Sequence, residues 1–189
     1  MKIGTTMNAE VQNVTDRMIQ NVFTASADSF SEFLGKRVTF ESLQNMSAEP
    51  VLYHLTRDEP LNLFISELRG DVKGTCFLVI PQRDCLEILK TQLSEEYLEN
   101  GTLQDALLTK LDVIVTENFI SVLKSELGLS TYTYIPKLKR GNKMELFSFL
   151  KSEEAHLQID QRYKAVLKME EVRVQPFFSW VLEEKAGKK

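Results

Sequence analysis

The chain has 189 residues, of which 43% are hydrophobic and 26% charged, so it can form one substantial globular domain or two small ones. A formal net charge of −4 and the absence of a long basic run argue against nucleic-acid binding. No apolar run approaches the length of a membrane span, the N-terminal segment lacks the apolar core of a signal peptide, and the only cysteines are Cys76 and Cys85. We therefore expect a cytoplasmic protein with reduced thiols and without membrane insertion.

The first predicted element is a long helix over residues 9–34, which ends before Gly35. Its apolar residues recur at three- and four-residue spacing, as in a helix with one face in a core: Val11, Val14, Met18, Val22 and Ala25. A short strand signal follows at Val38–Phe40, and a polar, turn-rich segment extends from residue 44 to residue 60. The chain is thus expected to begin with a helix and a short strand.

A β-hairpin is the clearest local pattern in the sequence. Leu61–Leu68 and Val72–Ile80 are two runs of strand-forming residues, and Gly70 lies in the turn between them. Pro81 is expected to end the second strand, and residues 84–93 to form a short helix.

A second long helix is predicted over residues 103–127, with Thr102 as its N-cap and Gly128 as the left-handed residue that ends it. One apolar stripe is expected to face the core: Leu108, Leu111, Val115, Phe119, Val122 and Leu123. The opposite row of the helix consists of Lys110, Val113, Glu117, Ile120 and Lys124. Because Val113 and Ile120 interrupt a charged row, this row is either a second packing surface inside the domain or a docking surface for a partner.

The remainder of the chain repeats the order of the first half. Residues 131–134 are expected to form a strand that Pro136 breaks, and residues 143–150 a short helix. The short basic cluster at residues 137–140 is expected to be a solvated loop, and residues 156–182 are expected to form another hairpin.

This repeated order predicts an internal duplication within one domain of residues 1–189. Gly35 and Gly128 each end a long helix just before a short strand, so the repeats are expected at about residues 9–93 and 102–182. The predicted fold class is α+β, with two long helices packed on one antiparallel sheet.

Four short segments carry a resemblance to a known family: Phe33–Val38, Leu68–Gly74 with Pro81 beyond it, Ser125–Leu129 and Ile135–Pro136. In these segments and in its order of elements, the chain resembles the CheC/CheX/FliY family of chemotaxis phosphatases. The resemblance implies a CheC-like fold and hydrolysis of the aspartyl phosphate of a CheY-like response regulator. In that family a Glu-x-x-Asn pair on a long helix acts together: the carboxylate contacts the partner's active-site lysine, and the amide orients the attacking water.

The sequence departs from this motif at the expected positions. Counted back from Gly128, the Glu and Asn positions hold Lys110 and Val113, which can neither attract a lysine nor position water. Counted back from Gly35, they hold Arg17 and Gln20, and only Gln20 keeps an amide. The one Glu-x-x-Asn in the chain is Glu10 with Asn13, two helical turns upstream on the first helix.

Two functions therefore remain open. An aspartyl-phosphate phosphatase would use Glu10 and Asn13, or Gln20, as catalytic residues, whereas a non-catalytic binding module of the same fold would only dock a signalling protein. In both cases the resemblance implies that a CheY-like response regulator meets the outward helix faces. The expected contact residues are Arg17, Lys110, Val113, Glu117, Ile120 and Lys124.

No other chemistry is indicated. His54 and His156 are the only histidines, no Cys/His spacing suggests a metal site, and no Gly-rich phosphate loop occurs, so we expect neither a metal nor a cofactor. The aromatic cluster at residues 177–181 is expected to be a core strand, with an interface in a homodimer as the alternative.

Overall fold

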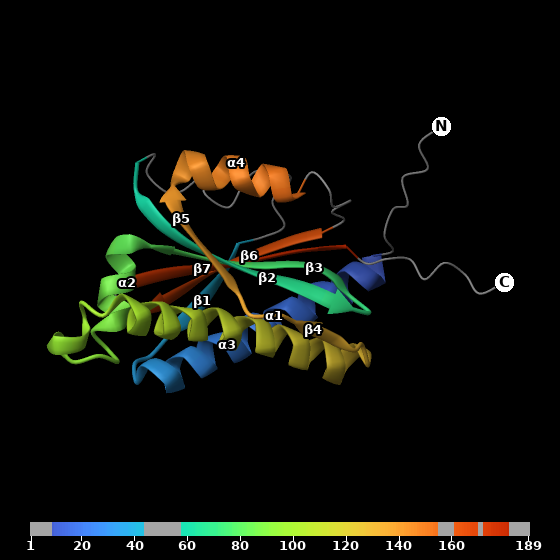
Figure 1. Cartoon of the computed structure of the whole chain (residues 1–189). Helices are drawn as coiled ribbons and strands as arrows, with labels where there is room; N and C mark the ends of the chain where they lie inside the picture. The colour runs from blue at the N-terminus through green and yellow to red at the C-terminus, as the bar shows by residue number, and fades with distance from the viewer. Residues whose placement is uncertain (1–8, 44–57, 155–160, 170–171, 182–189) are drawn as a thin grey trace.

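This computed structural model describes residues 9–43, 58–154, 161–169 and 172–181 (Figure 1). The helices in these ranges are α1 (Ala9–Leu34), α2 (Gln82–Leu89), α3 (Gly101–Leu127) and α4 (Lys143–Glu154), with a 3-10 turn, η2 (Glu95–Tyr97), between α2 and α3. The strands are β1 (Thr39–Leu43), β2 (Pro60–Gly70), β3 (Lys73–Pro81), β4 (Thr131–Thr133), β5 (Lys137–Asn142), β6 (Gln161–Met169) and β7 (Val172–Val181). Most of the predicted turn-rich segment, residues 44–57, lies outside the described residues.

The described strands belong to one seven-stranded antiparallel sheet in the order β1-β6-β7-β3-β2-β4, and β5 also pairs with β2. The predicted hairpin is confirmed, because Leu61 pairs with Pro81 and Leu68 pairs with Gly74. The second hairpin is confirmed as β6 and β7, where Met169 pairs with Val172. The α+β fold class is therefore correct, whereas the internal duplication stays a prediction.

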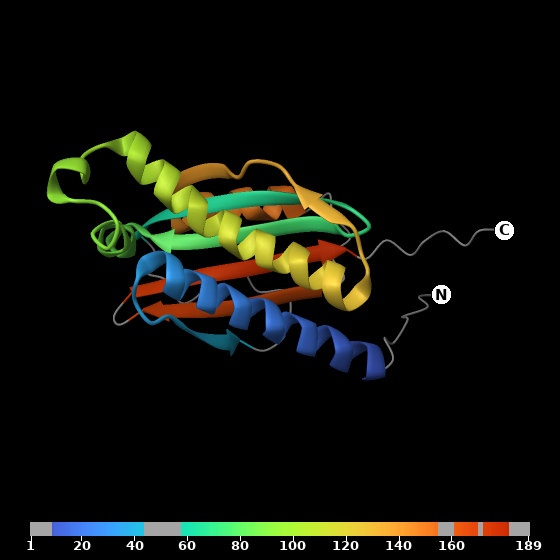
Figure 2. The same ribbon diagram turned by 90° about the horizontal axis from the view of Figure 1, so that it is seen from below.

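Helices cover both faces of this sheet. α1 and α3 lie side by side across one face, and α4 lies on the other (Figures 1 and 2). β2 explains the two layers, because successive side chains of a strand point to opposite faces. Phe64 and Leu68 join the main core beneath α1 and α3, whereas Leu61, Leu63 and Ile65 pack against α4.

The turn of the first hairpin is docked against the start of β4. Gly70 has a φ of 112°, a conformation that favours glycine, and a Cβ at this position would collide with the carbonyl oxygen of Ser130. The backbone N–H of Asp71 donates to that oxygen at 2.9 Å, and the Asp71 carboxylate accepts from the backbone N–H of Ser130 at 2.9 Å. A glycine is therefore required where the turn meets β4.

Two local predictions are wrong. Asn100, not Thr102, caps α3, because the Asn100 side chain accepts from the backbone N–H of Leu103 at 3.1 Å. The basic cluster at residues 137–140 is not a loop but part of β5, where Lys137 pairs with Ile65 of β2. The cluster is short and charged, so its strand conformation depends on this pairing and on the packing of Leu138 against the main core.

Candidate functional site

The candidate site is the outer face of the α1–α3 helix pair, which Figure 2 shows with no described element in front of it. On α1, helical periodicity buries Met18, Val22 and Phe30 and leaves the other side exposed. We define the outer face by the exposed residues Arg17, Gln20, Asn21, Thr24 and Asp28 of α1 and Lys110, Glu117, Ser121 and Lys124 of α3.

The two apolar residues predicted for this face, Val113 and Ile120, are half-buried. Ile120 packs against the main core. For Ile120, this favours internal packing over docking, the two interpretations given for the α3 row. Lys110, Glu117 and Lys124 are exposed as expected. The part of α3 that a partner can reach is therefore mainly charged.

Polar contacts fix the seam between the two helices at two points. Asn118 Nδ2 on α3 donates to Ser29 Oγ on α1 at 3.2 Å. Asn21 Nδ2 on α1 donates to Glu126 Oε1 on α3 at 2.6 Å. Because residues 21 and 29 of α1 meet residues 126 and 118 of α3, the helices are antiparallel, and the two bonds join the helices along the seam. Sequence reasoning missed these residues, since nothing in the sequence shows which helix faces adjoin.

The predicted catalytic residues lie on α1. Glu10 and Asn13 are in its first turns, where the backbone alone is described. At about 1.5 Å per residue, Asn13 is about 12 Å along the axis from Asn21, which contacts the last turn of α3. Gln20 is exposed on the outer face together with Arg17. The structure therefore places Gln20 within the outer face and Glu10 with Asn13 near one end of α1.

A carboxyl group is buried on the inner side of α3. Asp112 is 1% exposed and accepts a 2.5 Å hydrogen bond from the hydroxyl of Ser66 on β2. Burial raises the pKa of Asp112 to about 7, although hydrogen bonds from Ser66 and Thr116 lower it. Burial, and secondarily Asp112, raises the pKa of the Cys76 thiol well above its usual range. This group lies between α3 and the sheet, so it affects stability rather than contact with a docked partner.

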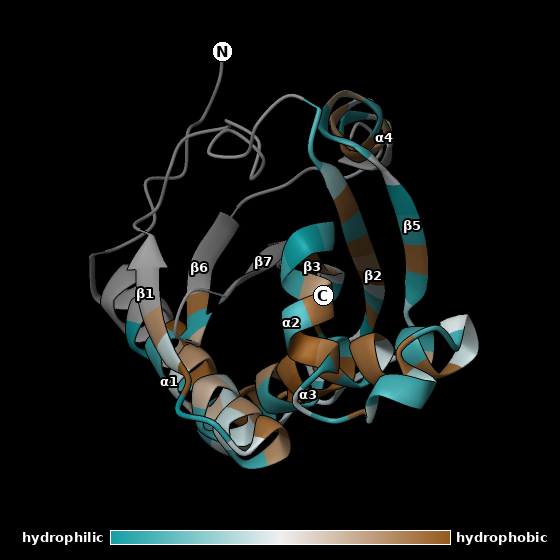
Figure 3. Cartoon of the chain, turned by 90° about the vertical axis from the view of Figure 1, so that its left-hand side faces the viewer, coloured by the Kyte–Doolittle hydropathy of each residue, from teal (hydrophilic) through white to brown (hydrophobic). Residues whose placement is uncertain are grey.

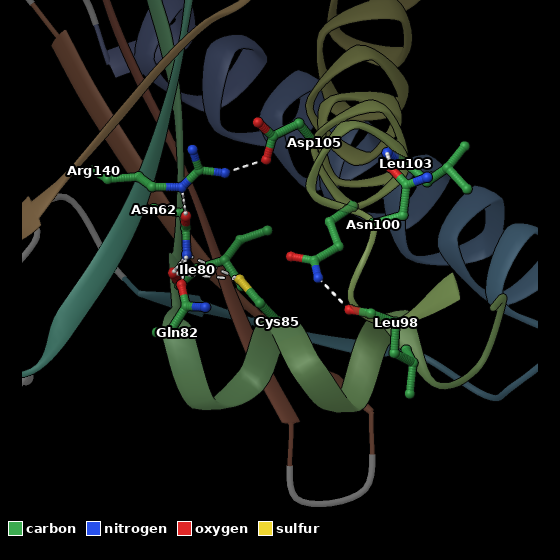
Figure 4. Close-up of polar contacts among 10 residues, drawn as sticks. Asn62, Ile80, Gln82, Cys85, Leu98, Asn100, Leu103, Asp105 and Arg140 are labelled. Atoms are coloured by element: carbon green, nitrogen blue, oxygen red, sulfur yellow. Dashed lines mark hydrogen bonds and ion pairs between the residues drawn. The ribbon is translucent and has the colours of Figure 1, made fainter. Parts of the chain in front are cut away.

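A second polar cluster joins α2, the start of α3 and β5 to β2 (Figure 4). Asn62 Nδ2 donates to Gln82 Oε1 at 2.8 Å and to Cys85 Sγ at 3.1 Å. The Asn62 Oδ1 accepts from Arg140 Nε at 3.1 Å, and Arg140 also forms an ion pair with Asp105. Burial raises the pKa of Cys85 to about 12, so the thiol stays neutral and is no nucleophile. The cluster therefore stabilises the packing of these elements.

Among the described residues, no group of three or more His, Cys, Asp or Glu side chains could hold a metal ion. His54 and His156 lie outside the described residues. None of the described helices is long and apolar enough to cross a membrane.

Comparison with known proteins identifies the fold. No family model and no curated protein matches the sequence. Solved structures do match: CheX from Vibrio vulnificus (TM-score 0.62, 10% identity, 87% of this chain and 99% of that chain) and FliY from Thermotoga maritima (TM-score 0.60, 10% identity, 95% and 93%). A third is a CheX–CheY–BeF3–Mg complex from Borrelia burgdorferi (TM-score 0.54, 15% identity, 84% and 95%). The chain thus has the fold of the CheC/CheX/FliY chemotaxis proteins, and the resemblance noted in the sequence is confirmed for the fold.

Proposed function

We propose that this chain is a signalling protein that binds a CheY-like response regulator through the outer face of the α1–α3 helix pair. The observation that carries the proposal is this face itself: two long antiparallel helices, joined by polar contacts at two points, present exposed polar and charged residues on the same side of the sheet. The same fold occurs in the Borrelia CheX that forms a complex with CheY. The proposal also gives the chain a role in chemotaxis or a related two-component pathway.

The charges on the outer face suit a transient protein contact. Arg17, Lys110 and Lys124 supply positive charge, and Asp28 and Glu117 supply negative charge. Mixed, exposed charges contribute more to the rate and specificity of association than to its free energy. A signalling encounter of moderate affinity is therefore the kind of binding that this surface supports.

Hydrolysis of the aspartyl phosphate is a finer proposal, with Glu10 and Asn13 as the acid and the amide and Gln20 as a second amide. An amide that positions water is enough for much of the catalysis of phosphoryl hydrolysis. A binding module without activity is the alternative. It is favoured by the exposed cation Lys110 and the half-buried Val113, which occupy the positions of the family's acid and amide on α3.

The binding experiment uses a cognate CheY-like response regulator activated with beryllofluoride and measures affinity by isothermal titration calorimetry. Lys110→Glu combined with Lys124→Glu reverses two charges on the outer face, and we expect a loss of affinity of about tenfold or more. The matched control is Lys151→Glu, an exposed residue of α4 on the opposite side of the sheet. Undiminished binding by a folded double variant would refute docking on this face.

The catalytic experiment measures phosphate release from the phosphorylated regulator. Removing one positioning group commonly slows a reaction by about 100-fold or more, so Glu10→Ala and Asn13→Ala should each abolish most of the acceleration. If both variants keep full activity while Gln20→Ala loses it, the water-positioning amide is Gln20. A wild-type chain that binds the regulator without accelerating phosphate release is the non-catalytic module.

A further inference from the structure

A second surface lies at the edge of the sheet, away from the outer face. β4 pairs with residues 68–70 of β2 and β5 with residues 60–65, so together they act as one interrupted edge strand. Of the described strands, β5 pairs with β2 alone, and Figure 3 shows it at the margin of the sheet. In an antiparallel strand, alternate residues direct their N–H and C=O groups away from the neighbour. β5 therefore directs some of its hydrogen-bonding groups away from β2, and no other described strand pairs with them.

The interruption between β4 and β5 is a β-bulge. Thr133 pairs with Leu68 and Lys137 with Ile65, so three residues, 134–136, lie opposite two residues of β2. The hydroxyl of Thr133 donates to the backbone oxygen of Glu67 at 2.8 Å and anchors the bulge.

Large apolar side chains are exposed at this bulge. Ile135 is 86% exposed, Tyr134 63% and Tyr132 55%. The two tyrosine rings contact each other edge to face, with centroids 6.1 Å apart. Single exposed apolar residues are common, but three within four positions of an edge are a local concentration of the kind that marks protein interaction sites.

The edge next to this patch is basic, although the chain as a whole has a net charge of −4. Lys137 and Lys139 alternate along β5 and so share one face of the strand. The Lys137 side chain is 74% exposed and lies 3.2 Å from Glu67, which also pairs with Arg69. Lys139 Nζ lies 4.3 Å from the ring centroid of Phe149 on α4. One carboxylate thus faces two cations, and positive charge remains in excess.

Charge decides which strand this edge accepts. If a second copy of the chain paired through β5, lysines of the two copies would face one another across the ladder, which is unfavourable. Carboxylates at alternate positions of an incoming strand would instead lie opposite Lys137 and Lys139. We propose that β5 binds an extended acidic segment of a partner protein as an added strand, with alternate carboxylates facing Lys137 and Lys139 and an apolar residue packed on Tyr134 and Ile135. This surface is distinct from the face proposed for the response regulator.

The test uses a fluorescein-labelled eight-residue peptide in which valine and glutamate alternate, with binding followed by fluorescence anisotropy. We expect saturable binding to the wild-type chain, at least tenfold weaker binding to Lys137→Glu with Lys139→Glu, and unchanged binding to the control Lys110→Glu with Lys124→Glu. A peptide with lysine in place of glutamate should not bind. Thermal melts check that both double variants are folded.

Two further measurements distinguish strand addition from attraction between charges alone. A peptide methylated at alternate backbone nitrogens loses its hydrogen-bond donors, and we expect it to bind at least tenfold more weakly. The acidic peptide should also slow amide hydrogen exchange in β5 but not in α1. Equal binding by the methylated peptide, unprotected β5 amides, or a wild-type dimer that Lys137→Glu with Lys139→Glu abolishes would each overturn the proposal.

Discussion

The buried carboxyl of Asp112 should make the stability of the protein depend on pH. Asp112 lies on the inner side of α3; Ser66 on β2 and Thr116 one turn further along α3 hydrogen-bond to it, and its charge acts on the thiol of Cys76 on β3. The pKa of Cys76 is well above its usual range, so that thiol stays neutral between pH 4 and pH 8. Asp112 is then the group in this cluster that titrates in that range.

The sign and size of the effect follow from the pKa of Asp112, which rises from 3.8 for an exposed carboxyl to about 7 in the folded chain. A raised folded pKa means that the protonated carboxyl favours the folded state. Its contribution is fully present below the unfolded pKa, decreases as the pH rises, and is lost above about pH 7. A pKa shift of about three units, at about 1.36 kcal/mol per unit, corresponds to a loss of about 4 kcal/mol in the free energy of unfolding between pH 4 and pH 8.

The assay is urea denaturation of the wild-type chain and Asp112→Asn at pH 4, 5, 6, 7 and 8. Other carboxyl groups titrate alike in both proteins, so the difference between their free energies of unfolding isolates Asp112. Between pH 4 and pH 7, we expect the free energy of unfolding of the variant to rise relative to that of the wild type by about 1.4 kcal/mol for each pH unit. Above pH 7 we expect the difference to stay constant. Ser66→Ala, which removes a hydrogen bond that lowers the pKa, should extend this window to higher pH. A difference that stays constant from pH 4 to pH 8 would show that Asp112 is ionised throughout and refute the reasoning.

Three further predictions concern stability and reactivity. Gly70→Ala should lower the free energy of unfolding, measured by urea denaturation, by about 2 kcal/mol or more, because the φ of residue 70 is positive and a Cβ there would meet the Ser130 carbonyl. Gly101→Ala, where a Cβ would have nothing within 4 Å, should not lower it. Ile120→Lys should lower the free energy of unfolding by about 1–3 kcal/mol because Ile120 packs on the main core, and the exposed neighbouring substitution Ser121→Lys should not. Both cysteines are buried with raised pKa values, so a thiol reagent at pH 8 should label them only after unfolding in urea, and rapid labelling of the native chain would contradict their burial.

Long periodic elements and glycine-marked turns could be predicted from the sequence. The α1 and α3 stripes extend over several turns, and Gly128 adopts the left-handed φ of 65° expected of a residue that ends a helix. The β2–β3 hairpin was also predictable, because two strand-forming runs are separated by a turn glycine that the structure holds at a φ of 112°. In these cases local conformation and burial favour the same structure.

Elements that depend on distant partners could not be predicted. β5 is charged and short, and it becomes a strand through pairing with residues 60–65 of β2. The half-burial of Ile120 depends on how α3 packs in the folded domain, which the periodicity of α3 alone does not specify. The bonds from Asn21 to Glu126 and from Asn118 to Ser29 also depend on which helix faces adjoin.

The two helices of the proposed site, α1 and α3, differ in the residues that they carry at the positions expected for the family's motif. Counted back from Gly128, the positions expected for the family's acid and amide on α3 are occupied by the exposed cation Lys110 and the half-buried Val113, so we expect no acid–amide pair on this helix. On α1, Arg17 and Gln20 are both exposed, and Gln20 is the amide that we expect to position water if the chain is catalytic. A cation beside that amide would repel the lysine of a response regulator but could pair with its phosphoryl oxygens or acidic side chains. The two halves are therefore expected to contribute unequally: charge reversal on α3 should change affinity, whereas any catalytic activity should depend on α1.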